Sequence, residues 1–137
     1  MPHDPARVED TRSWLAKANA DCRAAAFDLT AEPPLTADSV FHAQQAAEKA
    51  LKGFLAWHDI PFRKTHDLAE IGRQCAEIDA TLESLLQRST RLTEYAWKFR
   101  YPGDAEEPTR QEAESALALA LEVVGAVLRR IPPEARP

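Results

Sequence analysis

Apolar residues recur along the chain at spacings of three and four, which is the period of an amphipathic α-helix. No stretch alternates apolar and polar residues for long enough to predict a strand. Prolines divide the pattern into segments of helical length, at Glu32-Pro33-Pro34, Ile60-Pro61, Tyr101-Pro102-Gly103, Glu107-Pro108 and Ile131-Pro132-Pro133. The pattern therefore predicts an all-α protein.

Five helices fit between these breaks. We expect four long helices, over about 8–29, from 38 or 39 to 58, from 79 toward Tyr101, and from Thr109 onward. At the start of the last helix, Thr109 and Glu112 fit a capping box. A shorter helix follows Thr65, which can cap its first turn. Because each long helix has one apolar face, the predicted fold is an up-and-down antiparallel helical bundle of four long helices and one short helix.

The length of 137 residues predicts a single domain over 1–137, with a core at about 8–131. A hydrophobic fraction of 45% with a net charge of −5 excludes a disordered chain. No apolar run reaches the length of a membrane span, so we expect no membrane association. The polar N-terminus lacks the pattern of a secretory signal, and the expected location is the cytoplasm.

The two cysteines, Cys22 and Cys75, are far apart and lack the spacing of metal ligands, so we interpret them as buried thiols. The sequence also lacks a glycine-rich phosphate loop, a GxSxG, an HExxH and a paired-aspartate magnesium motif. The sequence therefore indicates no metal ion and no cofactor.

The second predicted helix carries a polar stripe that contains Lys49 and Lys52. This stripe is either a solvated outer face or part of an anion site. The same helix places Gln44 on its apolar side, where a buried amide needs hydrogen-bond partners. Basic residues continue through Arg63 and Lys64 to His66, at the start of the short helix, where backbone N–H groups favour anions.

Arg100 and Tyr101 stand where the fourth predicted helix ends, because Tyr101 precedes a proline. Counted along that helix, Arg100 returns to the face that carries Leu82 and Leu86, so it must pair, reach solvent or meet a ligand. It either closes the end of the bundle or presents a guanidinium, beside the Tyr101 phenol, to phosphate and base. Pro102-Gly103 fits the centre of a type II turn that continues into Asp104.

Three motifs in this order resemble the HEPN domain (higher eukaryotes and prokaryotes nucleotide-binding). They are Phe41-His42-Ala43-Gln44-Gln45-Ala46-Ala47-Glu48-Lys49-Ala50-Leu51-Lys52, Lys64-Thr65-His66-Asp67-Leu68, and Arg100-Tyr101-Pro102. The resemblance implies a helical bundle that commonly forms homodimers. It also implies a minimal nucleotidyltransferase as a partner, and toxin–antitoxin systems as one context.

The ribonuclease members of that superfamily carry an Arg followed after four to six residues by a His, and this chain lacks that spacing. We therefore identify no catalytic residue and expect a non-enzymatic subunit that binds a nucleotide or a nucleotidyltransferase. The alternatives are an RNA-cleaving toxin that uses Arg100 and His66 in a non-standard arrangement, and a structural dimerisation module with Trp57 or Trp97 at its interface. The predicted nucleotide-binding residues are Lys49, Lys52, His66, Arg100 and Tyr101.

Overall fold

The computed structural model describes residues 2–103 and 106–137, and every regular element in those ranges is a helix. The elements are α1 (Pro5–Asp28), α2 (Thr36–Trp57), α3 (Leu68–Ile78), α4 (Glu83–Ser89) and α5 (Arg110–Leu128), with short 3₁₀ segments η1 (Ala80–Leu82), η2 (Thr90–Ala96) and η3 (Pro133–Ala135). The predicted all-helical bundle is confirmed. No helix in the described ranges is long and apolar enough to cross a membrane.

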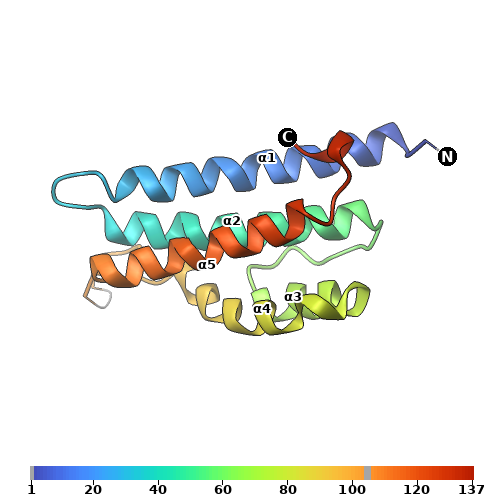
Figure 1. The fold of residues 1–137 in the computed structure, drawn as a ribbon. Helices are drawn as coiled ribbons and strands as arrows, with labels where there is room; N and C mark the ends of the chain where they lie inside the picture. Colours follow the sequence, from blue (N-terminus) through green and yellow to red (C-terminus); the bar gives the residue numbers. More distant parts are fainter. Residues whose placement is uncertain (1, 104–105) are drawn as a thin grey trace.

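Helix α2 lies at the centre of the bundle, in contact with α1, α5, α3 and η2 (Figure 1). Its buried alanines, such as Ala43 and Ala47, are fully shielded and let the neighbouring helices approach closely. At Gly53 a Cβ atom would lie 3.1 Å from the Leu15 side chain of α1, so any larger residue there would require the neighbouring side chains of α1 to shift.

The core consists of apolar side chains from all five α-helices. Its largest fully buried members include Phe54, Leu51, Leu55, Leu15 and Ile71. Each such side chain contributes roughly 1.5–3 kcal/mol of transfer free energy. The predicted helix faces are therefore the faces that pack.

The segment after Asp79 differs from the single long helix that the sequence predicts. It forms η1, α4 and η2 in succession, and it ends at Ala96 rather than near Tyr101. The hydroxyls of Ser89 and Thr90 donate to the carbonyl oxygens three residues earlier, at 2.9 and 2.8 Å, and so compete with the regular helical ladder. The bundle thus contains three long helices, and the region around Arg100 is not helical.

One of the two predicted helix caps is confirmed, and the other is wrong. The Thr109 hydroxyl accepts the Glu112 N–H at 3.0 Å at the start of α5. Asp67, rather than Thr65, is the N-cap of α3, and its carboxylate accepts the Ala69 N–H at 2.9 Å. Thr65 instead accepts the Asp67 N–H, which fixes the turn just before α3.

Candidate functional site

A buried carboxylate, Glu48, organises the polar groups at the middle of α2. Its Oε1 accepts hydrogen bonds from Gln44 Nε2 at 3.0 Å and from His66 Nδ1 at 2.7 Å, and its Oε2 accepts from Lys52 Nζ at 3.0 Å. Burial by itself raises the pKa of Glu48, but the hydrogen bonds from Gln44, His66 and Lys52 outweigh burial and hold that pKa below its ordinary value. Glu48 is therefore an ionised anchor for three donors.

Gln44 is fully buried and has the hydrogen-bond partners that the sequence requires of it. Besides Glu48, its amide nitrogen donates to the backbone carbonyl of His66 at 3.4 Å, and its oxygen accepts from Gln45 at 2.6 Å. Both the backbone and the ring of His66 are thus tied to α2.

The His66 side chain is 61% exposed although its Nδ1 is held by Glu48. A carboxylate accepts only, so Nδ1 carries the hydrogen and the Nε2 edge is directed away from Glu48. The ring is therefore exposed and oriented at the same time, as a side chain that contacts a ligand needs to be.

Lys52 is buried, with 6% of its surface exposed, so it does not belong to a solvated outer face. Its Nζ lies 5.7 Å from the ring centroids of both Trp14 and Phe62, and it pairs with Glu48. Glu48 therefore links Lys52 to His66, since it pairs with both.

Lys49 extends toward α1, where its Nζ lies 2.7 Å from Asp21 Oδ2. Arg63, another member of the basic segment, pairs with Glu70 at 2.7 Å. Carboxylates thus balance three of the basic charges, those of Lys49, Lys52 and Arg63.

Arg100 stacks on the face of Phe41, with its guanidinium carbon 3.8 Å from the ring centroid. Tyr101 follows it and is 69% exposed. Gly103 has a φ of +89°, as the third position of a type II turn requires, while Asp104 lies outside the described residues. Arg100 is placed by an aromatic contact with α2 rather than by the helical register counted from Leu82.

Arg100 and His66 contact the same face of α2. Arg100 stacks on Phe41, and His66 is hydrogen-bonded to Glu48. These two residues of α2 are seven positions apart, so they lie within about 20° of each other around the helix and roughly 10 Å apart along it. Two predicted residues that are separated by 34 positions in the sequence therefore contact the same face of α2, about two helical turns apart.

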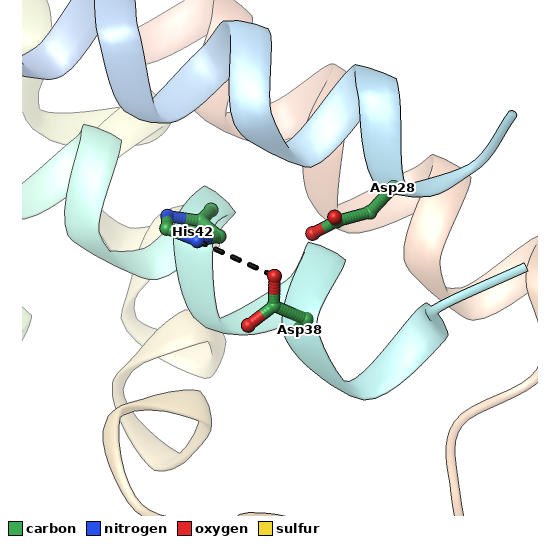
Figure 2. A group of neighbouring side chains, drawn as sticks. All are labelled: Asp28, Asp38 and His42. Carbon is green, nitrogen blue, oxygen red and sulfur yellow. Dashed lines mark ion pairs between the residues drawn. The ribbon is translucent and has the colours of Figure 1, made fainter. Parts of the chain in front are cut away.

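A second polar group lies where α1 ends and α2 begins (Figure 2). His42 Nδ1 lies 2.8 Å from Asp21 Oδ1, and His42 Nε2 lies 3.4 Å from Asp38 Oδ2. Asp28 faces the same space from the last residue of α1. Burial, followed by the interaction with Asp38, raises the pKa of Asp28 to about 6, against a lowering contribution from His42.

The sequence pattern did not predict this group. Asp38 and His42 are one helical turn apart, which the sequence does show, but Asp28 comes ten positions before Asp38 and meets it only because α1 and α2 pack antiparallel.

Other features lie apart from these polar groups. A hollow of about 270 Å³ between α3 and α4 is lined by residues such as Leu68, Gly72 and Leu86, and includes none of the predicted site residues. Cys22 and Cys75 are buried, as predicted, and burial raises their pKa values to about 11 and about 12.

The two tryptophans that were candidates for a dimer interface differ in exposure. Trp57 is buried at 9% exposure, beneath the His3 ring and the Arg7 guanidinium, so it is not available to a partner. Trp97 is 56% exposed.

The family model for the HEPN domain matches residues 11–131, which is most of the chain. No curated protein and no solved structure matches the chain.

Proposed function

Because the chain belongs to the HEPN domain family, we propose that it is a nucleotide-binding subunit that works with a nucleotidyltransferase partner in a two-component, toxin–antitoxin-like system. One observation carries the proposal: the oriented His66 ring and the stacked Arg100 lie over one face of α2. A guanidinium and an imidazole on one face suit the phosphates of a nucleotide.

The five predicted residues take different roles in this proposal. His66 and Arg100 contact phosphate, and the exposed Tyr101 stacks on the base or donates a hydrogen bond. Lys52 acts as a positioning residue, since it stabilises the Glu48 carboxylate that holds His66. Lys49 pairs with Asp21 of α1, which balances its charge, so it takes no direct part in binding phosphate.

The test is a titration of the purified protein with ATP and GTP by calorimetry. We expect Arg100→Ala to weaken binding by about tenfold or more, because charge-assisted contacts to phosphate are worth roughly 1.5–3 kcal/mol each. Arg88→Ala is the matched control, since Arg88 is an exposed arginine that pairs with Glu122 away from α2. Equal affinities for the wild type and Arg100→Ala would exclude the nucleotide site.

The partner is tested separately, by purifying the tagged protein from its native host and identifying what accompanies it. A stoichiometric nucleotidyltransferase supports the proposal. A homodimer without such a partner would instead favour the structural dimerisation module, with the exposed Trp97 as a candidate interface residue.

RNA cleavage is a second candidate function, favoured by the Glu48–His66 hydrogen bond. A histidine that donates Nδ1–H to a carboxylate is oriented as a general base commonly is, and Arg100 on the same face could stabilise phosphorane charge. If the protein cleaves RNA, expression of the wild type should arrest growth, and His66→Ala should relieve that arrest. A wild type that is harmless at high expression excludes it.

A further inference from the structure

Three side chains from two helices converge at the α1–α2 turn. Asp28 is the last residue of α1, and Asp38 and His42 lie one turn apart near the start of α2. Each offers one ligand atom, and the three atoms lie within 4.8 Å of one another. Figure 2 shows the three side chains directed toward a common space between the helices.

Asp28 is the unusual member of this group. It is only 8% exposed, and in the part of the chain that the structure describes no donor reaches its Oδ2, which is fully shielded. A buried carboxylate oxygen without a partner is costly, and the C-terminal end of a helix adds negative potential to that cost. Its surroundings therefore favour a positive ligand between Asp28 and Asp38.

His42 is oriented to complete such a site. Its Nδ1 is hydrogen-bonded to Asp21, whose charge Lys49 already balances. When Nδ1–H donates to Asp21, Nε2 is the ring nitrogen that faces Asp38, and a bound ion would take the place of a proton on its lone pair. A carboxylate that holds the far nitrogen of a histidine ligand in this way is the usual second shell of a protein metal site.

We propose that Asp28, Asp38 and His42 bind one divalent transition-metal ion, of the class of Zn²⁺ or Mn²⁺. One imidazole nitrogen and two carboxylates suit ions of this class, and the two carboxylates balance the charge of the ion. Asp38 is about half exposed, with 54% of its side chain accessible, which leaves room for water to complete the coordination. The ion would join the end of α1 to the beginning of α2.

The proposal is tested on EDTA-treated full-length protein by calorimetric titration with ZnCl₂ and, separately, with MnCl₂. We expect one site per chain and a rise in melting temperature of about 5–10 °C at a large excess of metal over the dissociation constant. Absence of saturable binding at millimolar concentrations of both metals would overturn the proposal.

Two variants separate this site from non-specific binding. Asp38→Asn changes a half-exposed side chain, so the protein should fold, and it should weaken metal binding more than about tenfold. Asp28→Asn should abolish binding while it raises the melting temperature of the metal-free protein, because its amide can donate to Asp38. Metal affinity equal to that of the wild type in both variants would overturn the proposal.

His3→Gln is the matched control, since His3 Nε2 lies 3.3 Å from Glu134 Oε1 in an exposed histidine–carboxylate pair away from the α1–α2 turn. Its metal affinity should equal that of the wild type. Loss of binding in His3→Gln with retention in Asp38→Asn would assign the metal to the chain terminus and overturn the proposal.

Discussion

Glu48 and Asp28 are both buried carboxylates, at 4% and 8% exposure, yet their surroundings drive their pKa values in opposite directions. Glu48 receives hydrogen bonds from an amide, an imidazole and an ammonium group, and its pKa falls. Asp28 is desolvated by burial and also faces the carboxylate of Asp38, and its pKa rises to about 6. Burial alone therefore does not decide the state of a buried acid; the donors around it do.

The comparison also separates two kinds of site. In the Glu48 network the carboxylate is balanced by its own donors, and the part that a ligand can reach is the exposed His66 ring that Glu48 orients. At the α1–α2 turn Asp28 Oδ2 has no hydrogen-bond partner among the described residues, and what the group offers to a ligand is the space that Asp28 and Asp38 face. The first suits recognition of an anion, and the second suits capture of a cation.

Removing Glu48 is the largest expected perturbation. Glu48→Ala leaves Lys52 as a buried charge without its partner and should lower the free energy of unfolding by about 3–5 kcal/mol. Urea unfolding measures the change. Glu122→Ala is the control, because Glu122 is half exposed and its pair with Arg88 should be worth less than about 1 kcal/mol. A loss of unfolding free energy no larger than that of the control would mean that Lys52 does not depend on Glu48 for its charge partner.

Acid should weaken the same network. Because the folded pKa of Glu48 lies below its ordinary value of 4.5, its contribution to stability is fully present above that value and is lost as pH falls through the folded pKa. The difference in free energy of unfolding between the wild type and Glu48→Gln should therefore shrink as pH falls from 7 toward the acid transition. A difference independent of pH would contradict the assignment of Glu48 as ionised.

Asp28 should respond with the opposite sign. Asp28→Asn removes a buried charge and adds a donor facing Asp38, so we expect the metal-free protein at pH 7 to gain about 1 kcal/mol. Urea unfolding in the presence of EDTA checks the sign. Glu48→Gln in the same buffer is the matched substitution, and it should destabilise the protein. If both substitutions destabilise, the two carboxylates do not differ as described.

The smallest expected effect on stability is at Arg100. Its stacking on Phe41 is exposed and should be worth about 0.5–1 kcal/mol, so Arg100→Ala should unfold close to the wild type. This makes Arg100→Ala a clean variant for the nucleotide titration. A loss of several kcal/mol would show instead that Arg100 closes the end of the bundle.

The helical bundle follows from local information. The spacing of apolar residues, the prolines and the cap at Thr109 are all properties of neighbouring positions, and they predict α1, α2, α3 and α5 closely. The segment after Asp79 is the exception. Its apolar positions fit a helix, but the hydroxyls of Ser89 and Thr90 interrupt the backbone ladder there.

The partners of the charged residues were not predictable in the same way. Lys49 and Lys52 lie on the predicted polar stripe of α2. The sequence does not show that the link before α3 covers Lys52, or that α1 faces Lys49. The contact of Arg100 with Phe41 likewise depends on where the chain goes after η2 ends.

The sequence by itself determined the helices and their apolar faces, because those depend on residues a few positions apart, and it indicated the HEPN family through three short motifs. Only the tertiary structure decided which charges meet: Glu48 with His66, Lys49 with Asp21, and Asp28 with Asp38. The physical reason is that electrostatic interactions act over a few ångströms in space, and helix packing sets those distances between residues up to 28 positions apart.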